Sequence, residues 1–255
     1  MIHPTAIVHP NAQIDRGVEI GPYCLVGENV TIGTGTVLHA HVVVNGWTTI
    51  GRDSQIYPFA TIGSSSQDRK YKGERAFTTI GDRTVVREYV SIQRATGEDE
   101  TTSIGDDCLL LAYVHIAHNC RVGNSVTMSN LAQLAGHVTV DDFAGIAGMV
   151  GMHQFVRVGK YAFVGGYTKL GRDLPPFFLC EGNPAKAYGL NSAGLKRAGF
   201  GPQDVAELKA FYKLIYGSKR NLSQALEEME ATVKTQPGRE LIAFLRTDSD
   251  RGILK

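Results

Sequence analysis

The chain has 255 residues, with 26 Lys and Arg against 25 Asp and Glu and 43% hydrophobic residues. This near-neutral charge argues against a protein built to coat nucleic acid, and no run approaches the roughly 18 apolar residues that a membrane span needs. The opening residues, MIHPTAIVHP, show neither the basic segment nor the apolar stretch of a signal peptide. We therefore expect a cytoplasmic protein of one or two domains, with no integral membrane segment and no nucleic-acid partner.

A period of six residues dominates the chain. Stepping by six from Ile2 to Leu170 visits 29 positions, and 26 of them hold Ile, Val, Leu or Met. This is the hexapeptide repeat of parallel β-helices, in which three hexads close one triangular coil. Small residues four positions further on, including three of the four cysteines, suit a narrow interior. The sequence predicts about ten coils stacked about 4.8 Å apart, with the cysteines reduced.

Two polar interruptions keep the phase of the repeat and are predicted to project from the coils as loops. They span residues 64–78 and 96–102. Long loops on a rigid scaffold are common places for function. The repeat stops at Leu170, and the Pro175-Pro176 pair is expected to end the array.

The last part of the chain changes to helical spacing. We expect a β-helix domain over residues 1–190 and a small helical domain over residues 191–255, with Ser223 as a helix N-cap. The expected helices span residues 202–216, 222–233 and 240–245.

The helical part is also basic. Residues 191–255 carry 11 Lys and Arg against 8 Asp and Glu, and residues 196–220 carry six against two. A solvated helix face would explain this excess, and so would a docking site for an acidic partner.

Four of the eight histidines fall close together in the uninterrupted part of the repeat. Residues 18 apart should stack on successive coils, which places Gly136 on His118 and Gln154 on Gly136. The other three histidines expected at this corner are His115, His137 and His153.

Three interpretations of this corner are open. The pair His115 and His118 could bind a metal, but no Cys or carboxylate stands in phase with it, and a structural corner would not need so many polar groups. A general base fits best, because His118 could deprotonate a hydroxyl while the Gly136 amide stabilises the developing negative charge. Cys120 should point inward, which favours direct transfer over a covalent intermediate. We expect neither a metal nor another cofactor.

A set of motifs in a fixed order resembles one family of hexapeptide enzymes, the acyl-[acyl-carrier-protein] UDP-N-acetylglucosamine O-acyltransferases of lipid A biosynthesis. The resemblance implies a left-handed parallel β-helix, a homotrimer, and an acyl carrier protein as donor. The implied reaction moves a 3-hydroxyacyl group from the carrier's phosphopantetheine thioester to the 3-position of the nucleotide sugar. The motifs are HVVVNG (41–46), QDRKYKGE (67–74), HIAHNC (115–120), LAGHVTVDDFA (134–144), HQF (153–155), DLPPF (173–177), EGNPA (181–185) and LNSAGLKRAGF (190–200).

The resemblance also implies roles for individual residues. His118 matches the general base and Gly136 the glycine whose amide meets the thioester oxygen. The matching loop residues that hold the acceptor and the pantetheine are Asp68 and Lys70. Matches to residues that line the cleft or contact the nucleotide sugar are His115, His137, His153, Gln154, Asn191 and Arg197. The stretch that gauges acyl length contains Phe163, Gly166 and Tyr167.

Four positions depart from the family pattern. Asn119 follows the base where better-known members have Asp, and Gln93 stands in the place of a histidine. Ala193 and Ala198 replace an acidic and a basic residue. Because these positions surround the predicted acceptor pocket, the acceptor could be the 3-amino analogue of the sugar, which would yield an amide.

Two other functions fit the same scaffold. A coenzyme A-dependent acetyltransferase would also use a hexapeptide array, but the basic helical tail suits an acidic carrier protein. A non-catalytic β-helix would share the coil, but the stacking of His118, Gly136 and Gln154 disfavours a purely structural corner.

Overall fold

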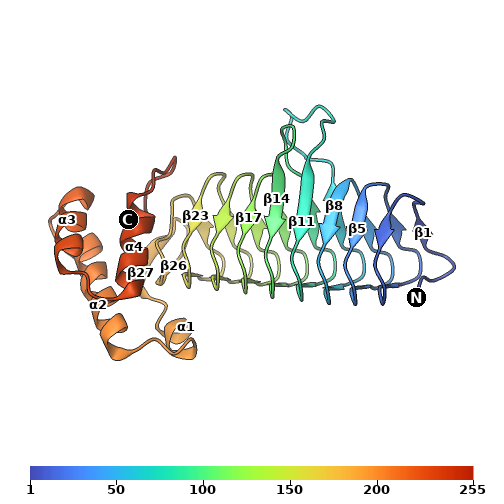
Figure 1. The fold of residues 1–255 in the computed structure, drawn as a ribbon. Helices are drawn as coiled ribbons and strands as arrows, with labels where there is room; N and C mark the ends of the chain where they lie inside the picture. The colour runs from blue at the N-terminus through green and yellow to red at the C-terminus, as the bar shows by residue number, and fades with distance from the viewer. Residues whose placement is uncertain (255) are drawn as a thin grey trace.

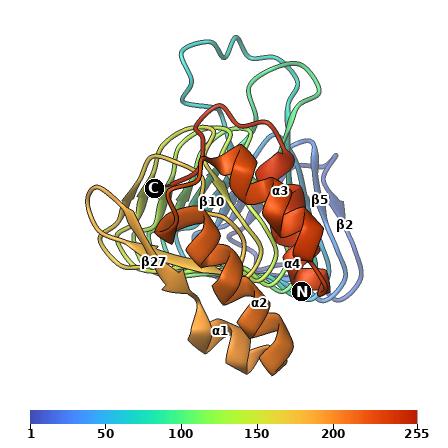
Figure 2. The ribbon, with the colours of Figure 1, turned by 90° about the vertical axis from the view of Figure 1, so that its left-hand side faces the viewer.

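The computed structural model describes residues 1–254 and shows a long triangular coil that ends in a group of helices (Figure 1). Three sheets of nine, eight and ten strands form the faces of the coil. All neighbouring strands are parallel except the final pair, β26 and β27. Figure 2 looks along the coil and shows its triangular outline behind the helices. The predicted left-handed parallel β-helix is confirmed.

Each face takes one strand from nearly every coil. The first sheet contains β1 (Ile7–Val8), β4 (Leu25–Val26), β7 (Val43–Val44), β10 (Thr61–Ser64), β13 (Ser91–Gln93), β16 (His115–Ile116), β19 (Gln133–Leu134), β22 (Gly151–Met152) and β25 (Lys169–Leu170). The second contains β2 (Gln13–Ile14), β5 (Val30–Ile32), β8 (Trp47–Ile50), β11 (Phe77–Ile80), β14 (Thr101–Ile104), β17 (Arg121–Val122), β20 (Thr139–Val140) and β23 (Arg157–Val158). The third contains β3 (Glu19–Ile20), β6 (Val37–Leu38), β9 (Gln55–Ile56), β12 (Val85–Val86), β15 (Leu109–Leu110), β18 (Thr127–Met128), β21 (Gly145–Ile146), β24 (Phe163–Val164), β26 (Phe178–Glu181) and β27 (Lys186–Leu190).

The period of six arises because the aliphatic residues, from Ile20 onward, are buried inside the coil. Ile116, Leu134 and Met152 are aligned neighbours on successive coils, and all three are buried. All four cysteines are buried and free. Contact between like positions on successive coils therefore builds one continuous apolar core.

The two polar interruptions leave the coil as loops. One connects β10 to β11 and the other connects β13 to β14, and both extend beyond the edge of the coil beside these strands (Figure 1). Both loops leave from the edge between the first and second sheets.

The array does not end at the two prolines. β26 follows them and pairs in parallel with β24, with Phe163 aligned to Leu179, and β27 then returns antiparallel. The prolines are accommodated because they lie before β26, where the ladder does not require their missing N–H groups. β27 ends at Leu190 and the first helix begins at Ser192.

The helical part differs from the prediction in four places. The short helix α1 (Ser192–Arg197) was not predicted, and the segment 202–216 forms α2 (Pro202–Tyr212) followed by the π-helical turn η1 (Lys213–Gly217). In α3 (Leu222–Thr232) the N-cap is Asn221 and not Ser223, since the Asn221 side chain accepts from Gln224 N–H and Gln224 bonds back in a capping box. The last helix, α4 (Gln236–Arg246), begins earlier than expected because Thr235 caps it.

A buried carboxylate ties the end of the chain to the coil. Asp173 is fully buried and accepts from Arg157 Nε at 2.7 Å and from Ser249 Oγ at 2.6 Å. Its backbone carbonyl accepts from Leu254 N–H at 2.8 Å. Within residues 1–254, no helix has the length and apolar character needed to span a membrane.

Candidate active site

The corner after β16 carries the central histidine. β16 ends at Ile116 and β17 begins at Arg121, so His118 and Asn119 lie in the turn between the first and second sheets. Asn119 has a φ of 58°, a left-handed conformation that Asn tolerates better than most residues. The turn leaves only 14% of the His118 side chain exposed.

Asn119 fixes the His118 ring. Its Oδ1 lies 2.9 Å from His118 Nδ1. The backbone of Thr96 determines which way the amide points, because Thr96 N–H donates to Oδ1 at 3.0 Å and Nδ2 donates to the Thr96 carbonyl at 3.1 Å. A backbone N–H can only donate, so Oδ1 is an acceptor and the facing Nδ1 must donate. The neutral imidazole therefore carries its proton on Nδ1 and leaves Nε2 free to accept one.

Gly136 lies on the next coil, directly against the His118 ring. A β-carbon at Gly136 would stand 2.5 Å from Nε2 and 2.5 Å from Cε1 of His118, so a side chain there would displace the ring. Among the residues that the structure describes, no hydrogen-bond acceptor pairs with the Gly136 N–H. A free backbone N–H beside an imidazole whose Nε2 can accept a proton is suited to stabilising an oxyanion.

His137 packs beside the same ring. Its N–H donates to the His118 carbonyl at 3.0 Å, and its imidazole meets the His118 ring edge-on with centroids 5.2 Å apart. The other face of His137 stacks on Phe155 at 4.7 Å. Burial lowers the pKa of His137, and the electrostatic repulsion that two protonated neighbouring rings would have adds to this effect.

Asp68 approaches the free nitrogen of His118 from the loop between β10 and β11. Asp68 Oδ2 lies 3.9 Å from His118 Nε2, and 23% of its side chain is exposed. Asp68 N–H donates to Ser66 Oγ at 3.1 Å, and Lys70 N–H donates to Asp68 Oδ1 at 3.0 Å. The loop therefore brings a carboxylate to the ring and places Lys70, with an exposed side chain, beside it.

A groove of about 580 Å³ runs along the first sheet beside this corner. His115 lies in it with Nδ1 2.7 Å from Ser91 Oγ, and burial lowers the pKa of His115. His153 and Gln154 line the same groove and are exposed. The groove is further lined by Ala117, Gln133, Leu134, Ala135, Gly151, Met152, Lys169 and Gly171.

Three of the predicted site residues lie on another face. Phe163, Asn191 and Arg197 line a second groove, of about 520 Å³, on the third sheet, and none of the corner histidines lines it. Asn191 is the N-cap of α1. Within one chain, the predicted sugar-contacting residues therefore form two separate sets.

Gly166 and Tyr167 occupy a third position. Both are exposed at the corner between β24 and β25, where the third sheet meets the first. A β-carbon at Gly166 would lie 3.5 Å from the Gly148 carbonyl oxygen.

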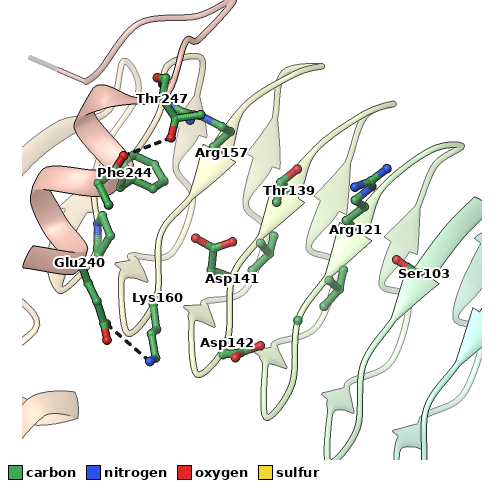
Figure 3. A pocket seen from close by; sticks show the side chains of 15 residues that line it. Ser103, Arg121, Thr139, Asp141, Asp142, Arg157, Lys160, Glu240, Phe244 and Thr247 are labelled. Carbon is green, nitrogen blue, oxygen red and sulfur yellow. Dashed lines mark hydrogen bonds and ion pairs between the residues drawn. The ribbon is translucent and has the colours of Figure 1, made fainter. Parts of the chain in front are cut away.

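Another groove, of about 700 Å³, lies between the second sheet and α4 (Figure 3). Part of its polar lining is paired within the groove, since Lys160 lies 3.4 Å from Glu240 and the Arg157 guanidinium donates to the Thr247 carbonyl at 3.3 Å. None of the predicted site residues lines it.

The inward cysteine two residues after His118 is inert. Burial raises the pKa of Cys120 to about 12, and its Sγ donates to the Ala135 carbonyl at 3.1 Å. A thiol in this state supplies no nucleophile near neutral pH. In the described part of the chain, residues 1–254, no three His, Cys, Asp or Glu side chains gather as a metal site.

Sequence reasoning missed the residues that hold this site together. Ser66 and Ser91 each contact a predicted site residue, and Thr96 contacts Asn119 beside His118, but none of the three was singled out. Ser91 had a usable signal, because it precedes His115 by 24 residues and a phase-preserving loop lies between them. Thr96 and Ser66 lie in the loops, where the repeat no longer predicts neighbours.

Comparison with known sequences identifies relatives. Residues 173–254 match the model for domain 2 of UDP-N-acetylglucosamine O-acyltransferase, and residues 1–34 match the bacterial transferase hexapeptide model. The chain is 49% identical to the acyl-[acyl-carrier-protein]–UDP-N-acetylglucosamine O-acyltransferase of Thermodesulfovibrio yellowstonii. That match covers 245 residues, which are 96% of this chain and 94% of its relative.

Solved structures of similar proteins agree with this relationship. The UDP-N-acetylglucosamine acyltransferase of Francisella novicida matches with a TM-score of 0.97 at 37% identity, over 100% of this chain and 94% of the other. The Acinetobacter baumannii protein LpxA gives a TM-score of 0.97 at 40% identity, over 100% and 99%. The Arabidopsis enzyme gives 0.90 at 34% identity, over 100% of both chains. The chain therefore belongs to the UDP-N-acetylglucosamine O-acyltransferase family, as its motifs indicated, and is an acyltransferase.

Proposed function

We propose that this protein transfers a 3-hydroxyacyl group from the thioester of acyl carrier protein to the 3-position of UDP-N-acetylglucosamine, the first step of lipid A biosynthesis. Family membership supports the class of substrates. The observation that carries the chemistry is the His118 ring, whose free nitrogen lies against the backbone of Gly136. The four free cysteines fit the reducing cytoplasm as its location.

The proposed reaction is a direct transfer. His118 Nε2 takes the proton of the acceptor group while the acceptor atom bonds to the thioester carbon. The Gly136 N–H stabilises the oxyanion that forms on the thioester oxygen. The carbon–sulfur bond then breaks, and the thiolate of phosphopantetheine receives the proton from His118. The buried, hydrogen-bonded Cys120 supports the absence of a covalent enzyme intermediate.

We propose that the active form is a homotrimer with sites shared between chains. The motivation is the separation of His118 from Asn191, Arg197 and Phe163 within one chain. An exposed apolar ladder offers a seam for such an assembly. Tyr23, His41, Phe59, Tyr89 and Tyr113 stack along the corner between the third and first sheets, with neighbouring ring centroids 4.8–5.1 Å apart.

The helical part is proposed to dock the carrier protein. A groove of about 510 Å³ lies between α1 and α2, and it is lined by Lys196, Lys209 and apolar residues such as Phe200 and Val205. In residues 1–254 neither lysine has an ion-pair partner, whereas Arg220 pairs with Glu228 at 2.7 Å. Unpaired lysines around an apolar groove suit an acidic protein that carries an acyl chain.

The acceptor substituent is proposed as a 3-hydroxyl or its 3-amino analogue. Asn119 contacts the base directly. Gln93 is buried and its Oε1 accepts from Gln67 N–H at 3.3 Å, next to Asp68. Asn119 and Gln93, two of the four departures from the family pattern, therefore lie close to the reacting position. The other two, Ala193 and Ala198, are exposed in and after α1. Mass spectrometry of products formed from both sugars, with a mixed pool of carrier-protein thioesters, identifies the acceptor and the acyl length.

The test of the mechanism is His118→Ala. Transfer should fall by about 10²–10⁴-fold, the usual contribution of a general base, while the melting temperature stays close to that of the wild type. His9→Ala, at an exposed position in an early coil, is the matched control and should keep full activity. Full turnover by His118→Ala would refute the assignment of the base.

Sharing of the site between chains has its own test. His118→Ala and Arg197→Ala chains are unfolded together, refolded and assayed. If one chain supplies His118 and its neighbour supplies Arg197, mixed trimers regain activity that neither variant has alone. Activity that stays at the level of the separate variants would show that each site lies within one chain.

A further inference from the structure

Thr96 uses all three of its polar groups at the site. It lies in the loop between β13 and β14, where its N–H and C=O hold the Asn119 amide. Its hydroxyl donates to Ser66 Oγ at 2.7 Å. Ser66 belongs to the other loop, between β10 and β11. One residue therefore joins both projecting loops to the corner of the coil.

The contacts of Thr96 lead to both nitrogens of the His118 ring. On one side, its backbone sets the Asn119 amide, which faces Nδ1 at 2.9 Å. On the other side, its hydroxyl holds Ser66, whose Oγ also accepts the Asp68 N–H at 3.1 Å. Asp68 Oδ2 then lies 3.9 Å from Nε2. Two chains of contacts therefore start at Thr96, and they end at the two ring nitrogens of His118.

The hydrogen bond from the Thr96 hydroxyl to Ser66 is partly shielded from water. Thr96 and Ser66 are both partly buried, so water competes poorly for their hydrogen bond. The flanking residues Ser65 and Gln67 are exposed. The other tether of this stretch is the Gln67 N–H, which donates to Gln93 at 3.3 Å. Loss of the Thr96 hydroxyl would leave this longer bond as the remaining tie of residues 65–68 to β13 and the loop that follows it. The next ties lie outside that stretch, where Ser64 accepts from Arg94 N–H at 3.0 Å and Glu74 accepts from Gly97 N–H at 2.8 Å.

We propose that Thr96 is a positioning residue that holds Asp68 against the His118 ring through Ser66. The proposal rests on the proposed role of His118 as the base. A carboxylate near Nε2 stabilises the imidazolium that forms when the base takes a proton, and this effect falls with distance. Thr96 therefore acts on the reaction only while Asp68 is present.

This dependence gives a double-mutant cycle. Thr96→Val keeps the shape and the backbone contacts but removes the hydroxyl, and it should lower kcat/KM about fivefold to tenfold, as expected for one lost hydrogen bond. In an Asp68→Ala background, Thr96→Val should have no further effect. Thr96→Ser restores the hydroxyl and should restore the rate. The control is Thr101→Val, in the neighbouring strand, because Thr101 Oγ1 makes no hydrogen bond within residues 1–254.

The pH profile separates positioning from a general structural effect. Thr96→Val and Asp68→Ala should both move the acidic limb of the kcat/KM profile to lower pH. Asp68→Ala removes the negative charge that favours the imidazolium, and Thr96→Val lets the Asp68 carboxylate move away from the ring. Ser66→Ala breaks the same link from the other loop and serves if Thr96→Val does not fold.

The outcomes distinguish this proposal from the proposed function. Full turnover by His118→Ala would refute the assignment of His118 as the base, and with it the proposed function. If His118→Ala is inactive but the effects of Thr96→Val and Asp68→Ala multiply, or the pH profile of Thr96→Val is unchanged, the base stands and the link through Thr96 is wrong.

Discussion

A β-carbon added at Gly136 would lie 2.5 Å from Nε2 of His118, so the Gly136 backbone packs directly against the imidazole of the preceding coil. The same glycine presents an N–H that no acceptor within residues 1–254 engages. The close approach and the free donor both depend on the absence of a side chain at this position.

Gly136→Ala should therefore damage catalysis more than folding. The added methyl group must displace the His118 ring, and we expect kcat to fall by about 10²-fold or more, with a stability loss of about 1–3 kcal/mol. Steady-state kinetics and thermal unfolding measure the two effects. Gly217→Ala is the control, because a β-carbon there meets nothing within 4 Å. Near wild-type turnover by Gly136→Ala would contradict the proposed role of this amide.

Asn119→Asp replaces the amide that faces His118 with a carboxylate. The negative charge favours the protonated imidazole, so the acidic limb of the kcat/KM profile should move to higher pH. The Thr96 carbonyl would also lose its donor, which should cost about 1–3 kcal/mol of stability. Kinetics across pH and urea unfolding provide the readouts, with Asn11→Asp at an exposed position as the control. An unchanged profile would show that the 119 side chain does not act on the base.

Stability should fall as the pH drops below about 6.5. Burial lowers the pKa of His115 from its ordinary value of 6.5, so the unfolded chain binds a proton there before the folded chain does. The free energy of unfolding therefore falls as the pH drops from the ordinary pKa to the lowered pKa of His115. Urea unfolding of the wild type and of His115→Gln at pH 7.5 and pH 5.5 checks this. The variant should lose less stability between the two conditions, and an equal loss would contradict the assignment.

Charge reversal on α2 and η1 should weaken the use of the carrier protein. Lys209→Glu with Lys213→Glu should raise the KM for acyl carrier protein about tenfold at low salt, and less at high salt because ions screen the attraction. Kinetics at two salt concentrations measure this. Lys234→Glu, an exposed position beyond this segment, is the control. A KM that does not change would place the docking surface elsewhere.

The helical part shows how far local sequence signals reach. The apolar spacing located α2, α3 and α4, but it placed the N-cap of α3 at Ser223. Asn221 caps the helix because Gln224 completes a capping box with it. The spacing also gave no sign of the π-helical turn after Tyr212, where Tyr212 and Tyr216 pack on Phe178 of the last coil. The capping box is a local signal that the spacing did not capture, whereas the π-helical turn lies where the helical part packs on the coil.

The sequence by itself determined the coil and one stack within it. A strict period of six leaves one arrangement for its aliphatic residues, so the 18-residue step places Gly136 beneath His118 without any coordinates. Only the tertiary structure decided what surrounds that stack. Thr96 and Asp68 lie in loops outside the repeat, where chain position no longer sets spatial neighbours. Arg197 is far along the chain. Its place beside the third sheet follows from the Asn191 amide at the start of α1, which donates to the Tyr161 carbonyl at 2.9 Å, and from the packing of α2 on β27.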